Sequence, residues 1–247
     1  MGVKGYRTIG GLHNNITIPV QSSRLEVAEK GMCEPAVDSN PAFGTVTLSP
    51  TKITGSVNIC KEMLVNTNSD VESFVIDQLL KEISYKIEQK MLGAVASAAA
   101  NTITYSSLAS ITWSDILAME AALDGYLLNE TAFVMNPAAR AALKATPKAT
   151  DAITGFICEG NEINGYRASI TGVALNDNIY FGDWSELVLA TWGEGGIDIL
   201  VDPYTESRAG NVIVVASALV DAAVVRPDAF CIGKVQDSSS SSSSGQE

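Results

Sequence analysis

Length, composition and charge already exclude several classes of protein. The chain has 247 residues, of which 46% are apolar and 18% charged, enough to bury the core of one large or two small domains. No apolar run approaches the roughly 18 residues that a membrane helix needs, and the opening MGVKGYRTIGG lacks the apolar core of a signal peptide. The sequence therefore predicts a soluble protein, with no membrane partner and no sign of secretion.

The formal net charge is −12, from 28 acidic and 16 basic side chains. No cluster of Lys or Arg along the sequence could neutralise a phosphate backbone, so we predict no direct nucleic-acid binding. The four cysteines, Cys33, Cys60, Cys158 and Cys231, show no C-x-x-C spacing. They are predicted to be reduced, partly buried small apolar residues rather than metal ligands or disulfides.

The first predicted elements are strands. Residues 16–20, 24–29, 43–48 and 51–60 alternate Thr, Val and Ile with polar residues, and 30–42, with two prolines, is typical of a wide loop. The pattern predicts a long hairpin-like arm. It has few large side chains with which to build a core, so it should pack against something else.

A long helix should follow the arm. Ser69 and Glu72 match a capping box, and a helix from there to Gly93 would span about 35 Å. Apolar residues recur every four positions and define one buried face. They are Val71, Val75, Leu79, Ile83, Ile87 and Met91, widened by Phe74, Leu80 and Leu92.

Two shorter helices are predicted after residues 97–110, which are small and polar and suggest a loop or weak strand. Thr112 or Ser114 can cap the first, with Asp115 in its first turn. Phe133-Val134-Met135 then ends at Asn136-Pro137. Because proline suits the first turn of a helix and disfavours helix in the residue before it, this corner is a strand-to-helix switch that needs no ligand.

The chain beyond Pro147 is predicted to be mostly β. Strands are expected at 166–175, 178–184, 186–193 and 196–202, with GEGG at 193–196 as a hairpin turn. The final run, 211–225, is apolar on both faces for much of its length and should be a central strand. Seven serines at 238–244 are interpreted as a disordered tail or an artificial addition.

The sequence shows no convincing active site, and we predict no catalytic, cofactor-binding or metal-binding residue. His13 is the single histidine and is interpreted as a solvated loop residue, because no G-x-S-x-G accompanies it. Glu82 and Glu88 are assigned to a solvated helix face. Asp183, which ends an apolar strand beside Trp184, is better explained by turn capping than by catalysis.

The order of these elements resembles the major capsid protein family of tailed phages, which has the Hong Kong 97-type shell fold. The resemblance covers roughly residues 15–235. It rests on the arm at 16–60, the run 55–93 from strand into long helix, FVMNP (133–137), NGYRASIT (164–171), YFGDW (180–184) and VRPDAF (225–230).

This resemblance implies an α+β fold with an extended loop, a peripheral domain built on the long "spine" helix and a β-sheet, and an axial domain. The implied divisions are a short N-terminal arm at 1–15, the extended loop and start of the peripheral domain at 16–60, the peripheral domain with the spine helix at 61–111, the axial domain at 112–205, the returning strand of the peripheral domain at 206–235, and a disordered tail at 236–247.

Relatives have a longer segment before the extended loop, which implies proteolytic maturation, a designed truncation or a naturally short member. Some also join subunits by a Lys–Asn isopeptide bond assisted by a glutamate. Alignment puts Cys33 at the reactive lysine, three residues from Lys30, and the partners near Gly210-Asn211 and on Ser217. The acid is missing, so we predict a noncovalent shell.

The function implied is that of a virion structural protein, made in the bacterial host cytoplasm, which is not an enzyme. Identical subunits would form hexamers and pentamers that close an icosahedral shell around DNA without binding it specifically. Portal, scaffold, maturation protease and decoration proteins are possible further partners. The alternatives are an encapsulin-like compartment shell, a small hydrolase or binding module, and a tail-tube protein, which the long helix disfavours.

Overall fold

The computed structural model describes residues 3–21, 28–32, 34, 43–60, 62, 71–123, 129–149, 155–174 and 178–236. Its strands are β1 (Arg7–Leu12), β2 (Ile16–Gln21), β3 (Phe43–Leu48), β4 (Thr51–Cys60), β5 (Asn101–Tyr105), β6 (Thr131–Met135), β7 (Glu162–Ile163), β8 (Tyr166–Ile170), β9 (Ile179–Asp183), β10 (Leu187–Asp202), β11 (Asn211–Val224) and β12 (Phe230–Val235). The α-helices are α2 (Val71–Ala98), α3 (Trp113–Ala121) and α4 (Pro137–Ala145). No helix in the described ranges is long and apolar enough to cross a membrane.

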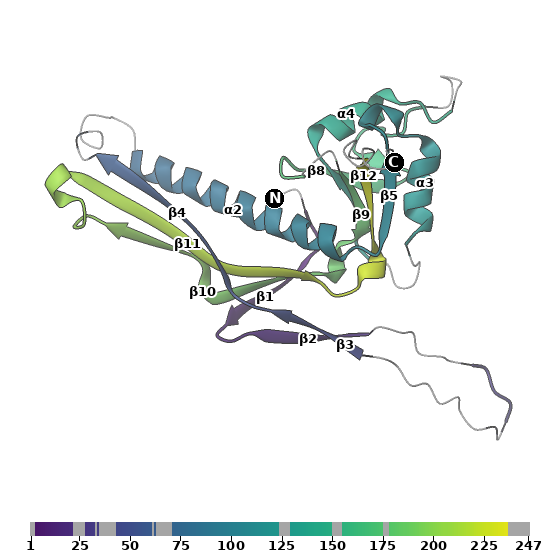
Figure 1. Cartoon of the computed structure of the whole chain (residues 1–247), viewed down its shortest axis with the longest axis horizontal. Coiled ribbons are helices and arrows are strands. Elements are labelled where there is room, and N and C mark those ends of the chain that lie inside the picture. The colour runs from purple at the N-terminus through teal and green to yellow at the C-terminus, as the bar shows by residue number, and fades with distance from the viewer. Residues whose placement is uncertain are drawn as a thin grey trace, which may run out of the picture.

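The elements form three parts (Figure 1). A four-stranded sheet in the order β1-β10-β11-β4 carries α2 along one face, and a six-stranded sheet in the order β5-β12-β9-β6-β8-β7 is accompanied by α3 and α4. The third part is the two-stranded hairpin β2–β3, which runs away from both sheets. Of the predicted arm strands, 16–20 and 43–48 form this hairpin, whereas 51–60 is strand β4 of the four-stranded sheet. Residues 22–27, 33 and 35–42 lie outside the described ones.

Helix α2 is longer than predicted, because it passes Gly93 and ends at Ala98. The residues after Gly93 are mainly Ala, a strong helix former, and Val95 continues the buried face at 0% exposure. At 1.5 Å per residue its 28 residues span about 42 Å. The predicted stripe is confirmed at Leu79, Ile83, Ile87, Met91 and Leu92.

One residue of that stripe is misplaced, since Phe74 is 62% exposed. It lies in the first turn of α2. The predicted cap at Ser69 lies outside the described residues.

Strand β11 is central, as predicted, with β10 on one side and β4 on the other. Alternate residues, Val214, Ala216, Ala218 and Val220, are buried in the same apolar cluster as α2. The small Ala side chains leave room for the helix to lie close to the sheet. The opposite face is only partly covered within the described chain, so apolar composition on both faces did not mean burial on both.

The prediction of a hairpin turn at GEGG is wrong. Residues 187–202 form one strand that pairs with β11 along both halves, and GEGG lies between the pairs Trp192↔Leu219 and Ile197↔Ala218. It is therefore a bulge. Gly193 and Gly196 have φ values of 87° and 75°, a left-handed conformation that glycine adopts without strain.

The two shorter helices, α3 and α4, begin where the sequence predicted. Thr112, rather than Ser114, precedes α3, and its N–H donates to Asp115 Oδ2 at 2.8 Å. Asn136 caps α4 by accepting the Ala139 N–H at 2.6 Å, and Pro137 is the first helical residue. The corner at 133–144 therefore folds the chain through local chemistry alone.

Sheet membership does not follow the divisions expected from the sequence. β10, placed by them in the 112–205 segment, pairs with β11 and β4 in the four-stranded sheet. β5 and β12, placed outside that segment, pair with each other in the six-stranded sheet and join β9 there. The boundaries at 111, 112 and 205 were drawn along the chain, whereas the chain passes between the two sheets three times: from β4 to β5, from β9 to β10 and from β11 to β12.

Close packing where β9 meets β12 gives a first test. A Cβ at Gly182 would lie 2.4 Å from Phe230 Cδ1 and 2.6 Å from the Ala229 carbonyl oxygen. The carbonyl oxygen belongs to the backbone and cannot move away easily. We expect Gly182→Ala to lower the free energy of unfolding by about 1–3 kcal/mol, measured by urea denaturation of dissociated subunits. Gly172→Ala is the control, because nothing lies within 4 Å of its Cβ position. Equal stability of the two variants would contradict this packing.

Candidate functional site

The residues considered as candidates for catalysis or metal binding do not form one site in the described structure. His13 is exposed in the turn between β1 and β2. Asp183 is fully buried at the end of β9, and no cluster of His, Cys, Asp and Glu with metal-binding geometry occurs in the described residues. The fold instead leaves apolar side chains exposed and part of a sheet edge unpaired within the described chain. The candidate site is therefore a set of contact surfaces.

Asp183 is a structural carboxylate. It accepts hydrogen bonds from the N–H groups of Asn129 (2.8 Å), Glu130 (3.1 Å) and Ser185 (2.9 Å) and from the Ser185 hydroxyl (2.7 Å). Burial alone would raise the pKa of Asp183, but these four donors outweigh it and the pKa lies below its ordinary value. The predicted turn-capping role is confirmed.

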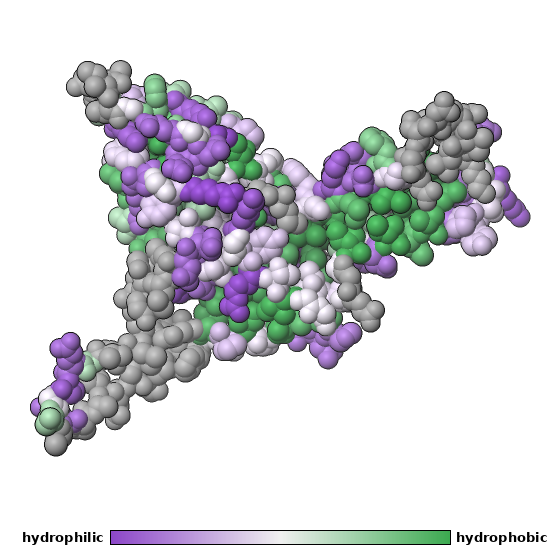
Figure 2. All heavy atoms as spheres, turned by 180° about the vertical axis from the view of Figure 1, so that it is seen from behind, coloured by the Kyte–Doolittle hydropathy of each residue, from purple (hydrophilic) through white to green (hydrophobic). Residues whose placement is uncertain are grey.

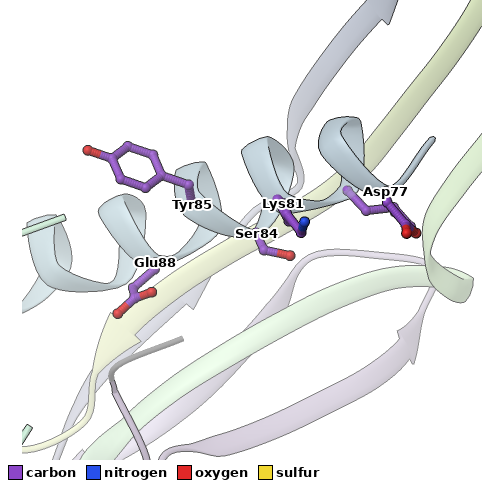
Figure 3. A pocket seen from close by; sticks show the side chains of 6 residues that line it. Asp77, Lys81, Ser84, Tyr85 and Glu88 are labelled. Atoms are coloured by element: carbon purple, nitrogen blue, oxygen red, sulfur yellow. The ribbon is translucent and has the colours of Figure 1, made fainter. Parts of the chain in front are cut away.

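The two glutamates assigned to a solvated face of α2 differ. Glu82 is exposed, but Glu88 is 5% exposed and accepts the Val3 N–H at 3.4 Å, so that assignment is wrong for Glu88. Figure 3 shows Glu88 at one end of a hollow of about 680 Å³. All of the described lining residues come from one helix, α2. Glu88 instead ties the N-terminal segment to the helix.

The arm packs against the four-stranded sheet, and its composition had predicted that it would pack against another part of the structure. Leu48 is buried with Val188, Ala190 and Trp192, and Ile16 and Ile18 pack against this cluster. The base of the arm is therefore fixed by apolar contacts, while the paired strands β2 and β3 point away from both sheets (Figure 1).

A polar contact holds the same base. Asp221 on β11 accepts the Ser49 N–H at 3.0 Å and pairs with Lys90 of α2 at 3.1 Å. Lys90 also donates to the Val220 carbonyl at 3.3 Å. This carboxylate thus connects the helix, the central strand and the residue that follows β3.

The second half of β10 is a free sheet edge. β1 pairs with β10 only from Val188 to Trp192, and within the described chain no strand pairs with 197–202 on that side. Ile199, Leu200 and Val201 are 38%, 62% and 41% exposed there. Unpaired backbone groups beside exposed apolar side chains favour pairing with another chain.

Other large apolar side chains are exposed elsewhere on this layer and just after β10. Phe74 and Leu219 are exposed on α2 and β11, and Tyr204, just after β10, is 82% exposed. Figure 2 shows a broad hydrophobic area over the projecting end of the layer formed by α2 and the four-stranded sheet. An apolar patch of this kind is typical of a protein–protein contact.

The cysteines and the isopeptide positions show no shared site. Cys158 and Cys231 are buried and free, and burial raises the pKa of Cys231 to about 11. Cys60 is exposed, contrary to the prediction of partial burial, because it ends the edge strand β4; Cys33 lies outside the described residues.

The other positions aligned with the isopeptide site lie on different parts of the chain. Lys30 is exposed, Gly210-Asn211 lie at the start of β11, and Ser217 lies within it. Whether the shell is noncovalent stays a prediction.

Comparison with known proteins identifies this architecture. The model of the phage capsid family matches residues 5–235. The chain belongs to the phage capsid family. It is 26% identical, over 95% of its length, to the major capsid protein of Halomonas phage phiHAP-1, and it spans 40% of that relative's length.

Solved structures show the same fold. The capsid of a native GTA particle superposes with a TM-score of 0.75 at 14% identity, covering 94% of this chain and 89% of the other. The capsid of Cyanophage P-SCSP1u gives 0.70 at 12% identity, covering 94% and 86%, and a structure from Mycobacterium phage Adephagia gives 0.70 at 11%, covering 94% and 89%. The predicted α+β capsid fold of Hong Kong 97 type is confirmed.

Asp183 gives a prediction about stability and its pH dependence. Asp183→Asn should lower the free energy of unfolding of the subunit by about 1–3 kcal/mol near neutral pH, because an amide cannot accept all four donors. The lowered pKa means that the carboxylate's contribution is complete above its ordinary value of 3.8 and is lost as the pH falls through the lower folded value. Denaturation curves at several pH values, with exposed Asp77→Asn as control, would measure this; a difference from wild type that persists unchanged to the lowest pH would contradict it.

Asp221 gives a prediction about the arm. Asp221→Ala should speed hydrogen exchange at the Ser49 amide, which loses its acceptor, with little effect on global stability because the Lys90 pair is partly exposed. Exchange measured by mass spectrometry on dissociated subunits would show it. Asp198→Ala on exposed β10 removes the same charge and should leave Ser49 unchanged; equal effects of both variants would refute a specific role of Asp221.

Proposed function

We propose that this chain is the major capsid subunit of a tailed phage, which assembles as hexamers and pentamers into an icosahedral shell around the DNA genome. The observation that carries the proposal is the match of the phage capsid family along residues 5–235. The exposed arm and the apolar edge of β10 that is unpaired within the described chain fit a subunit of such a shell. Its role is structural rather than enzymatic.

The proposed division of labour follows the sheets. The four-stranded sheet with α2 would be the peripheral domain, and the six-stranded sheet with α3 and α4 the axial domain that packs around fivefold and sixfold axes. The β2–β3 arm would be the extended loop that lies over a neighbouring subunit. In this assembly the surfaces left open by the isolated subunit become buried between copies.

The surroundings of the shell belong to the same proposal. The protein would be made in the bacterial cytoplasm and reside in the virion, with portal, scaffold, maturation protease or decoration proteins as further partners. The net charge of −12 suits a shell that encloses DNA without specific binding, since like charges keep the polyanion from adhering.

The arm provides the test. β2 and β3 pair from Ile16↔Leu48 to Gln21↔Phe43, so residues 22–42 can be replaced by an Asn-Gly turn that closes the hairpin. We expect the wild-type chain to form polyhedral particles in electron micrographs, and the shortened variant to fold with a melting temperature within about 5 °C of wild type but to form no closed shells.

Removal of the serines at 238–244 serves as the control and should leave particle formation intact. Wild-type protein that stays monomeric under all assembly conditions would contradict the proposed function. Closed shells built from the shortened variant would contradict the role of the arm.

A further inference from the structure

The fold gathers cationic side chains that lie far apart in the sequence. Lys4, from the segment before β1, Arg140 on α4 and Arg167 on β8 line one open depression of about 280 Å³, together with Asn161 and Ile170. A smaller hollow of about 80 Å³ is also lined by Lys4 and Arg167. A chain with a net charge of −12 thus concentrates positive charge in one place, which we call the cationic site.

None of these side chains forms an ion pair within the described chain. Its ion pairs join Lys90 to Asp221, Lys148 to Glu159 and Arg226 to Glu186, and none of them uses the cationic site. Arg140 donates to two neutral acceptors, the Gly160 carbonyl at 2.8 Å and Asn161 Oδ1, and its Nε is buried without a partner. Lys4 and Arg167 are exposed. The site is therefore open to an anionic group.

The surroundings favour a single carboxylate over a long polyanion. Glu162 lies directly opposite Arg167 in the β7–β8 pair, and Glu130 lines the smaller hollow. These carboxylates would repel a nucleic-acid backbone, whereas one carboxylate can approach two guanidinium groups, whose planar geometry matches it. Ile170, 37% exposed, adds an apolar contact of the kind found beside charges in protein interfaces.

The charge of the chain indicates the source of that carboxylate. With 28 acidic and 16 basic residues, two copies repel as they approach unless carboxylates of one meet cations of the other. We propose that the cationic site binds a carboxylate of a neighbouring copy of this chain and thereby sets how adjacent subunits align. This inference rests on the proposed shell function and adds the residues of one contact to it.

Zero-length cross-linking tests the contact directly. Particles would be assembled from an equal mixture of ¹⁵N-labelled and unlabelled chains and treated with a carbodiimide, which joins the Lys4 amine to a carboxylate in contact with it. We expect mass spectrometry to find Lys4 linked to an Asp or Glu peptide of mixed isotope content, lost when the particles are dissociated before treatment. Lys4 linked only within its own chain, as to Glu130, would overturn the proposal.

Variants supply the energetic test. Arg167→Gln and Lys4→Gln should raise the subunit concentration for half-maximal assembly roughly fivefold or more, and the difference from wild type should shrink at high salt, which screens the wild-type pair. Lys144→Gln removes one exposed charge from α4, outside the site, and should assemble like wild type.

The outcomes separate this inference from the shell itself. Wild-type particles with unchanged assembly of Arg167→Gln would overturn the cationic contact and leave the shell standing. So would normal assembly of that variant with reduced DNA retention, because the ligand would then be phosphate. A wild-type chain that forms no particles would overturn both proposals.

Discussion

The packing of α2 on one face of the four-stranded sheet is the contact on which the remaining structure depends. Leu79, Ile83, Ile87, Met91 and Val95 are at most 8% exposed and share one apolar cluster with β11 and β4. Each such side chain contributes about 1.5–3 kcal/mol when it is fully buried. The long helix therefore fixes a long sheet, including the half of β10 that lies beyond the reach of β1.

Because this contact uses only one face of the sheet, it also determines what stays open. The opposite face, the edge at 197–202 and the projecting hairpin are attached to a rigid layer but do not complete their own burial. In the proposed shell, identical copies would cover the surfaces that the isolated subunit leaves exposed. Weak contacts repeated over a closed shell would then suffice for a stable assembly.

Signals that depend on neighbouring residues were readable from the sequence. Pro137 with Asn136 predicted the start of α4, the four-residue repeat predicted the buried face of α2, and the apolar run at 211–225 predicted a central strand. GEGG misled because a hairpin turn and a bulge both require glycines with positive φ, and only the pairing of both halves of β10 with β11 distinguishes them.

Contacts between segments far apart in the chain could not be predicted from the residues next to them in the sequence. Nothing near Glu88 indicates that Val3 will cover it, and the charges of Lys4, Arg140 and Arg167 are too far apart along the chain to suggest one site. The resemblance to capsid proteins gave the fold correctly. The divisions drawn from it stay a prediction, and they do not coincide with sheet membership at β5, β10 and β12.

Hydrogen exchange compared between dissociated subunits and assembled particles tests the central claim most directly. If identical copies complete the open surfaces, backbone amides at 197–202 and in the arm strands 16–21 and 43–48 should exchange quickly in the subunit and be strongly protected in the particle. Amides within α2 should be protected in both. Equal exchange in the two states at 197–202 and in the arm would contradict the account.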